Sequence, residues 1–440
     1  MGYKKIFNCF ALLIASLIIM PLQALAASDE PQPVVHPEVL SLEQCLDLAI
    51  KNNKQIQEKE KKVTIAEGKV KEAKAGFLPT VAYQATLDKS NIEQYQVGMS
   101  LEDQKFSAGI VATLPLYTGG MLNYNLDLTK LQLEIAKEDL RKAKQQLIYD
   151  VKQAYYNVWL AGKVVQVQEA SYRNLDQHVN RVQIRYNAET ASRLDLMRAQ
   201  VQRDTLKPKV INAQNQLVLA KLQLATLIGY PKDQAYQVQA EVSEIIIPDS
   251  INLSLEEILK AADQERPELR QLRQKKEIDR ILTAMEEAGY KPNLGMSLTF
   301  GGINDEVGFN DWYAAWILTF TVGGKIYDGK INACIQQAKD NESLTGIQEA
   351  NVQDLIRLEA EQSLQNLTVS IENIRANQAS IDLAKEALRM TQIRVDNGMA
   401  TTMDIMDAQL ALDQALTGYY QGIVSYLTAE AKLDLVIGRD

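Results

Sequence analysis

Residues 183–200 read QIRYNAETASRLDLMRAQ, and residues 392–409, about 209 positions further along the chain, read QIRVDNGMATTMDIMDAQ. The two segments share the order of their apolar, basic and small residues. A shorter landmark, Ser-Leu-Glu, recurs in the same order at Ser41 and Ser254. A repeat of this length exceeds the repeating unit of a solenoid protein, so it indicates a duplicated half-protein.

The first 26 residues have the pattern of a secretory signal peptide. Lys4 and Lys5 precede an apolar run at 6–22, and Ala24 and Ala26 provide a small-residue cleavage site. An uncleaved anchor is the alternative, but the apolar run is short and a good cleavage site follows it. The remaining sequence has no run that approaches the roughly 18 apolar residues of a spanning helix. We therefore expect an exported protein that is soluble, peripheral or a membrane β-barrel.

Composition excludes several functions. Removal of the signal leaves 45 basic against 56 acidic residues, a net charge of −11, so nucleic acid is not an expected partner. Cys45 and Cys334 fall at non-equivalent places of the two halves and are interpreted as buried free thiols. His36 and His178 have no metal-ligating neighbours at useful spacing, so we expect no metal and no cofactor. No nucleophile with a base and no Gly-rich phosphate loop is visible, so an enzyme is not expected.

The duplication divides the chain into two structural repeats, at 41–228 and 254–440, joined by a linker at 229–253 that has room for a short strand. A Pro-rich leader at 27–40 precedes the first repeat. Each repeat is predicted to contain a helix, a pair of strands and a long helical hairpin. The opening helices are expected at 41–75 and 254–288.

Strand pairs are predicted at about 77–117 and 290–327, where apolar residues alternate with small polar ones. The polar or Gly-rich residues 88–105 and 301–311 are interpreted as loops between the paired strands. One face of each pair is apolar, whereas the other carries Ser, Thr and Gly, as in strands between lipid and water. A soluble sheet is the alternative. Aromatic residues near the strand ends fit an interfacial girdle: Phe77, Tyr117, Tyr290, Trp312, Tyr313 and Tyr327.

Four strands are too few to close a barrel. An open sheet edge is not tolerated in hydrocarbon, and single-chain barrels begin at about eight strands. If the strands lie in a membrane, several copies must share one barrel. Two copies would reach eight strands and three would give twelve, and strand count alone does not decide between them.

The helical hairpins are expected at 121–228 and 331–437, with tips at 187–192 and 396–401. The first arm, of roughly 65 residues, would extend on the order of 100 Å. Helices of this length must pair along their length, as a coiled coil or a helical barrel. Pro208 is expected to bend or loosen the returning helix of the first hairpin.

These features together resemble the TolC family of outer-membrane efflux proteins, over residues 40–440. The resemblance rests on the signal peptide, the duplicated halves, the strand pairs between long helices, and the repeated Asp-hydrophobic-x-x-Ala-Gln at 195–200 and 404–409. It implies a mainly α fold with membrane β. In such a homotrimer, four strands per chain form a 12-stranded β-barrel, continuous with a long antiparallel α-helical barrel across the periplasm.

The function that the resemblance implies is a passive exit duct in the cell outer membrane, part of a tripartite efflux or type I secretion system. A periplasmic adaptor protein would open its periplasmic end, and an inner-membrane transporter of RND, ABC or MFS type would supply the energy. The cargo remains open among drugs, metals and proteins. The alternative is an exported coiled-coil tether or adhesin without transport activity, which leaves the strand pairs and the duplication without a role.

The resemblance also points to candidate adaptor-contacting tips. The family pattern of an apolar residue, Gly and a further residue is best met by Asn397-Gly398-Met399. The corresponding place in the first half holds Ala188-Glu189-Thr190, so the Gly is absent there.

By the same alignment Asp404 and Asp407 fall where the family narrows its periplasmic entrance with acidic side chains, and Asp195 repeats the first of them. A ring of carboxylates around an aqueous pore attracts cations and repels anions. The alternative is that Asp404 is a helix N-cap and Asp407 a first-turn acid favoured by the helix dipole. Val395 and Ala400 occupy places where some relatives carry polar gating residues, so that type of lock is not expected.

Overall fold

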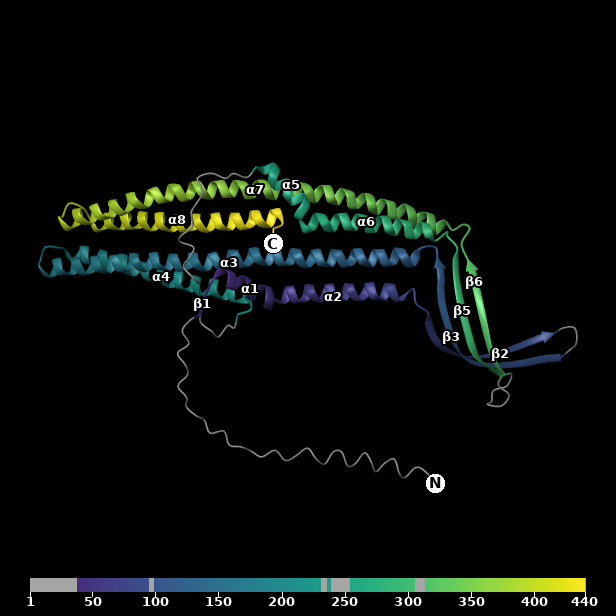
Figure 1. Cartoon of the computed structure of the whole chain (residues 1–440). Helices are drawn as coiled ribbons and strands as arrows, with labels where there is room; N and C mark the ends of the chain where they lie inside the picture. Colours follow the sequence, from purple (N-terminus) through teal and green to yellow (C-terminus); the bar gives the residue numbers. More distant parts are fainter. Residues whose placement is uncertain (1–37, 95–98, 231–235, 239–253, 305–312, 440) are drawn as a thin grey trace, which may run out of the picture. The chain divides into compact units, whose positions relative to one another are not determined.

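The computed structural model describes residues 38–94, 99–230, 236–238, 254–304 and 313–439, which contain two successive copies of one element order (Figure 1). The first copy consists of α1 (Leu42–Asn52), α2 (Lys54–Ala75), β2 (Thr80–Gln94), β3 (Met99–Thr118), α3 (Met121–Asn187) and α4 (Arg193–Ile228). The second consists of α5 (Leu255–Glu265), α6 (Pro267–Ala288), β5 (Asn293–Asn304), β6 (Tyr313–Gly323), α7 (Gly329–Asp396) and α8 (Thr402–Ile437). Helices α3 and α7 have 67 and 68 residues, and α4 and α8 have 36 each, so the duplication is structural.

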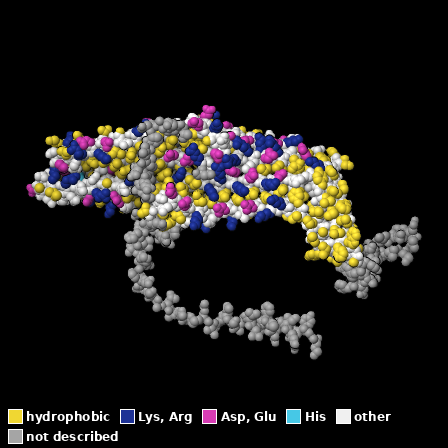
Figure 2. Space-filling model, in the orientation of Figure 1, with side chains coloured by type: hydrophobic (Ala, Val, Ile, Leu, Met, Phe, Trp, Pro, Cys, Tyr) yellow, Lys and Arg dark blue, Asp and Glu magenta, His cyan; other side chains and the backbone are white. Residues whose placement is uncertain are grey.

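The strands form one antiparallel sheet in the order β2-β3-β5-β6. Its register places Tyr83, Ile110, Phe300 and Trp316 in one row across all four strands. These four side chains are exposed in the single chain, and Figure 2 shows hydrophobic side chains gathered over the strands while charged ones are scattered over the helices. A neighbouring row on the opposite face has small or polar residues: Gln84, Gly109, Gly301 and Ala315. The predicted alternation of faces therefore holds across all four strands in these two rows.

Three strands, β2, β3 and β5, are longer than the sequence predicts. The β2–β3 register continues to the pair Gln94 and Met99, through residues that we interpreted as a loop. Similarly, β5 continues to Asn304. Ladder hydrogen bonds join backbone groups, so pairing continues where the side chains become polar. Strands β2 and β6 are the two edges of this sheet among the described strands.

Long helices pack along one another. α3 contacts α4, and α7 contacts α8, as two antiparallel hairpins, while α2 lies along α3 and α6 along α7. The main hydrophobic core includes Val151, Leu224, Ile374 and Val436, each at most 2% exposed. Along α7, Ile374 belongs to this core, whereas Gln378, one turn further on, is exposed.

The opening helices are a correction to the sequence analysis, because each is two helices rather than one. The first breaks at Asn53, which has an extended backbone and caps α2 by accepting a hydrogen bond from Gln55 N (2.8 Å). The second breaks at Arg266, because Pro267 disfavours a helical conformation in the residue before it. By contrast, α4 continues through Pro208 without ending.

The linker contributes a short strand, β4 (Tyr236–Val238), which pairs with β1 (Glu38–Leu40). The signal peptide, residues 27–37 of the leader and Trp312 lie outside the described residues. Both cysteines of the described chain are free thiols, but only Cys45 is buried and Cys334 is half-buried, so the prediction of two buried thiols is wrong for Cys334. No helix in the described ranges is long and apolar enough to cross a membrane.

Candidate functional site

The tip of the first hairpin is a tight turn at residues 188–192. The backbone N–H of Thr190 donates to the carbonyl oxygen of Arg185 (2.8 Å), and that of Glu189 donates to Tyr186 (3.0 Å). This is the Schellman pattern, which requires a left-handed residue just beyond the helix end. Glu189 takes that position with φ 59°, the one non-glycine residue with positive φ in the described chain.

The tip of the second hairpin, at 397–401, has the same turn with glycine in the left-handed position. Met399 N donates to Arg394 O (2.7 Å) and Gly398 N to Val395 O (3.0 Å), with Gly398 at φ 73°. A Cβ on Gly398 would meet no atom within 4 Å, so backbone conformation rather than crowding favours glycine there. Glu189 and Gly398 therefore correspond in backbone conformation as well as in their place in the sequence repeat.

Both returning helices begin with a capping box. Ser192 Oγ accepts from Asp195 N (3.1 Å), and the Asp195 carboxylate accepts from Ser192 N (3.2 Å). In the second hairpin Thr401 N donates to Asp404 Oδ2 (2.7 Å), and Thr401 is the N-cap. The suggestion that Asp404 is itself the N-cap is therefore wrong, because Asp404 is the third helical residue and completes the box.

Hydrogen bonding in these boxes favours the ionised carboxylates. The side chain of Ser192, followed by its backbone N–H, lowers the pKa of Asp195. The backbone N–H of Thr401, followed by its hydroxyl, lowers the pKa of Asp404. Both acids stay charged through the neutral range for a local structural reason.

Asp407 has no such structural role. It lies six residues after the Thr401 cap, beyond the first turn of α8, so the interpretation as a first-turn acid does not hold. Its side chain is exposed, and within the described chain it has no hydrogen-bond or ion-pair partner. Of the three candidate constriction residues, Asp407 is therefore the one whose carboxylate takes no part in a contact within the described chain.

The tips present apolar side chains and a groove. Met399 is 72% exposed at the second turn, and Leu194, Met197 and Met403 are also more than half exposed. A groove of about 860 Å³ runs between the two tips, and its lining includes Gly398 and residues from α3, α4 and α8. An exposed apolar groove of this kind is typical of a surface that another protein covers.

Contacts between the hairpins lie just behind the tips, and sequence reasoning missed them. Arg185 Nη1 donates to the carbonyl oxygen of Val395 (3.1 Å), and Arg181 Nη2 donates to Gln392 Oε1 (2.8 Å). Val395 itself is buried beside Ile405 and Ala400. As expected, Val395 is not part of a polar gate. It lies in an apolar cluster, and only its backbone carbonyl oxygen accepts a hydrogen bond, from Arg185.

His178 also lies behind the tips, 2% exposed, and neither ring nitrogen has a hydrogen-bond partner in the described chain. Burial, followed by the charge of Arg181, lowers the pKa of His178, so the ring is neutral at neutral pH. Burial raises the pKa of Cys45 to about 11, so this thiol is not a reactive thiolate. The described residues hold no cluster of three or more potential metal ligands.

The chain is similar to known proteins along most of its length. A sequence model of the family described as "Outer membrane efflux protein" matches residues 45–230 and 258–439. The chain is 23% identical over 401 residues to outer membrane protein TolC of Escherichia coli K12, covering 84% of this chain and 76% of TolC. It is also 23% identical over 319 residues to the alkaline protease secretion protein AprF of Pseudomonas aeruginosa, covering 70% and 64% of the two chains.

Solved structures share the fold. CusC, described in terms of transmembrane channel formation, superposes with a TM-score of 0.78 at 18% identity, covering 91% of this chain and 92% of CusC. The open state of the MtrE outer membrane channel of Neisseria gonorrhoeae superposes with a TM-score of 0.74 at 18% identity, covering 90% and 89%. The predicted fold class is confirmed.

Paired long helices joined to a four-stranded sheet with one apolar face define the fold of an outer-membrane channel. The chain belongs to the outer membrane efflux protein family, as predicted, because the family match covers both repeats. The protein is therefore an outer-membrane channel protein of the efflux and secretion class, with its helical hairpins on the periplasmic side. The relatives are channel and membrane proteins rather than enzymes, in keeping with the sequence analysis.

Proposed function

We propose that three copies of the chain form one passive exit duct. The three sheets together make a 12-stranded barrel in the outer membrane, and the hairpins make a water-filled helical tube below it. The duct serves a tripartite efflux or type I secretion system, in which an adaptor binds the periplasmic tips and an inner-membrane transporter of RND, ABC or MFS type supplies the energy.

One observation carries this proposal: a sheet with a continuous apolar face ends at β2 and β6 without closing on itself. Unpaired edge groups are not tolerated in hydrocarbon. Pairing of β6 from one copy with β2 from the next removes both edges, and twelve strands are within the range of outer-membrane barrels.

The tips provide the proposed adaptor surface. Asn397-Gly398-Met399 and Ala188-Glu189-Thr190 are exposed turns of one geometry, and the groove between them is partly apolar. Repetition of two similar turns in three copies would give six similar docking positions, which suits a ring of adaptor hairpins. AprF, a relative, is a secretion protein by name, and this supports the secretion branch of the proposal as much as drug efflux.

The proposed constriction consists of Asp404 and Asp407 with Asp195. The capping hydrogen bonds hold Asp195 and Asp404 ionised, while Asp407 is exposed and uncommitted. Three copies of these acids around a common axis would form rings that concentrate cations at the entrance.

Purification of the mature protein in detergent tests the duct directly. We expect a particle of three chains that conducts ions when inserted into planar lipid bilayers. A monomer that stays in the aqueous phase without detergent and conducts nothing would reject the duct and favour the exported tether or adhesin.

A further inference from the structure

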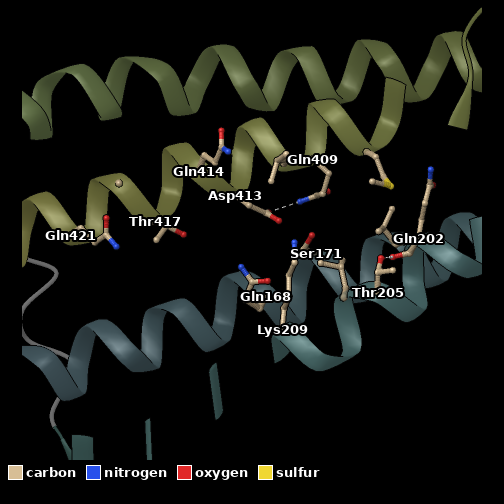
Figure 3. A pocket seen from close by; sticks show the side chains of 15 residues that line it. Gln168, Ser171, Gln202, Thr205, Lys209, Gln409, Asp413, Gln414, Thr417 and Gln421 are labelled. Atoms are coloured by element: carbon tan, nitrogen blue, oxygen red, sulfur yellow. Dashed lines mark hydrogen bonds between the residues drawn. The ribbon is translucent and has the colours of Figure 1, made fainter. Parts of the chain in front are cut away.

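A second pocket, deeper in the hairpins than the tips, lies between α3, α4 and α8 (Figure 3). Its volume is about 370 Å³. Within the described chain, Asp413 and Lys209 are the charged side chains of its lining. The other polar lining residues are neutral amides and hydroxyls: Gln168, Ser171, Gln202, Thr205, Gln409, Gln414, Thr417 and Gln421. None of the proposed tip or constriction residues lines it.

Asp413 on α8 is 8% exposed and incompletely hydrogen-bonded. Gln409 Nε2 donates to Asp413 Oδ1 (2.8 Å), and Asn174 Nδ2 on α3 donates to Gln409 Oε1 (3.1 Å). Burial raises the pKa of Asp413, while Ser171, Gln409 and Lys209 act in the opposite direction. A carboxylate held in this way has capacity for at least one further donor.

Two groups on α3 point to a missing partner in the same place. Ser171 is 1% exposed, and its Oγ has no hydrogen-bond partner in the described chain. The side chain nevertheless lies close enough to Asp413 to lower the pKa of that carboxyl group. One turn earlier, the buried Oε1 of Gln168 also has no partner in the described chain. Buried polar atoms are nearly always satisfied, so unpartnered oxygens lining a cavity indicate that a ligand or water fills it.

Lys209 supplies the opposite charge. Figure 3 shows its side chain reaching from α4 toward the space below Asp413. No ion pair within 4.0 Å joins Lys209 to Asp413, although both line the pocket. The pocket therefore offers a carboxylate and an ammonium group that are separated rather than paired.

We propose that this pocket binds a small zwitterion of amino-acid size, with its ammonium group on Asp413 and Ser171 and its anionic end on Lys209. A simple cation would satisfy Asp413 and leave Lys209 unpaired, whereas a simple anion would do the reverse. The cavity exceeds the space of a few waters and lies at the small end of ligand pockets, which suits such a molecule.

Occupancy would join the two hairpins of one chain. Asp413 belongs to the second hairpin and Lys209 to the first, so a bound zwitterion bridges α8 and α4. Binding of this kind stabilises the hairpin arrangement that brings the two charges together. The site is independent of whether the assembly conducts, so its failure would leave the proposed duct untouched.

Calorimetric titration of the purified mature protein in detergent tests the site, with 4-aminobutyrate as the zwitterion. Butylamine and butyrate carry only one of its charged groups. We expect 4-aminobutyrate to bind and each of the other two to bind about tenfold more weakly or worse, because each loses one charge-assisted contact. Asp413→Asn and Lys209→Met should each weaken 4-aminobutyrate binding by about tenfold or more.

Matched controls lie on exposed positions outside the pocket. Lys207→Met removes a lysine two residues from Lys209, and Asp382→Asn removes an aspartate from α7; both should bind as the parent does. If Asp413→Asn fails to assemble, the exposed Lys209→Met gives the same test. Absence of 4-aminobutyrate binding, or butylamine binding as tight as that of 4-aminobutyrate and unchanged in Lys209→Met, would overturn the proposal.

Discussion

The two hairpin tips have one backbone geometry and different chemistry. Each ends in a Schellman turn and restarts with a capping box, but the left-handed position holds Glu189 in one and Gly398 in the other. A left-handed conformation costs a side-chain-bearing residue about 1–2 kcal/mol. The hairpin therefore holds the turn geometry and tolerates a strained residue, so differences in function between the tips must come from side chains.

Making the second tip resemble the first should have the largest effect. A Cβ added at Gly398 would meet no atom within 4 Å. Gly398→Glu therefore adds a charged side chain to the proposed adaptor surface, at the cost of about 1–2 kcal/mol for a left-handed residue that carries a side chain. We expect transport through the adaptor in cells to fall on the order of tenfold, the effect of about 1.4 kcal/mol of lost binding, with the trimer intact in detergent.

The control for that exchange is Gly346→Glu, since Gly346 on α7 also has open space around it and lies far from the tip. Transport should be unaffected there. Undiminished transport in Gly398→Glu would remove the second tip from the proposed adaptor surface.

The second largest effect should distinguish the two acidic residues that follow the second tip, Asp404 and Asp407. Asp407→Ala removes a carboxylate that the fold does not use, so cation preference and block by polyvalent cations should weaken several-fold, as expected for an entrance ring, while thermal stability stays unchanged. Asp404→Ala should weaken them further but also fray the start of α8, because the Thr401 capping box is lost. Single-channel recording measures the first effect and circular dichroism melting the second.

Asp382→Ala, on an exposed site of α7, is the matched control for lost negative charge. Selectivity that is identical in the parent and in the double variant Asp404→Ala with Asp407→Ala would exclude the ring.

Local patterns in the sequence predict the hairpins and the alternating faces of the strands, because helical and strand periodicity shows in the spacing of apolar residues close in sequence. The break at Asn53 has a weaker signal, an Asn that caps from an extended backbone. Contacts such as Arg185 with Val395 join residues 210 positions apart, and the Asp413 pocket needs three helices to meet. Neither follows from a local pattern. Positive φ at Glu189 is also unexpected, because glycine is the usual signal.

Making the first tip resemble the second should have a smaller effect. Glu189→Gly relieves the left-handed strain but gives the unfolded chain more freedom, so the net gain is at most about 1 kcal/mol. Amide hydrogen exchange at Thr190, whose N–H closes the turn, should slow by up to roughly fivefold. Glu189→Gln keeps the strain and should leave exchange unchanged; faster exchange in Glu189→Gln would mean that the carboxylate stabilises the turn.

Acidification should produce the smallest effect, and it should act on both tips alike. The pKa values of Asp195 and Asp404 lie below their ordinary value in the folded chain. Their contribution is therefore fully present above the unfolded value of about 3.9 and is lost as pH falls through the lowered folded values. Exchange protection of the first turns of α4 and α8, corrected for intrinsic rates, should decline only below about pH 4. Asp195→Asn should abolish the decline at α4 and leave α8 unchanged, and Asp404→Asn should do the opposite. A decline that begins near pH 6 would instead implicate another group, such as a histidine. The capping boxes would then not be the source of acid sensitivity at the tips.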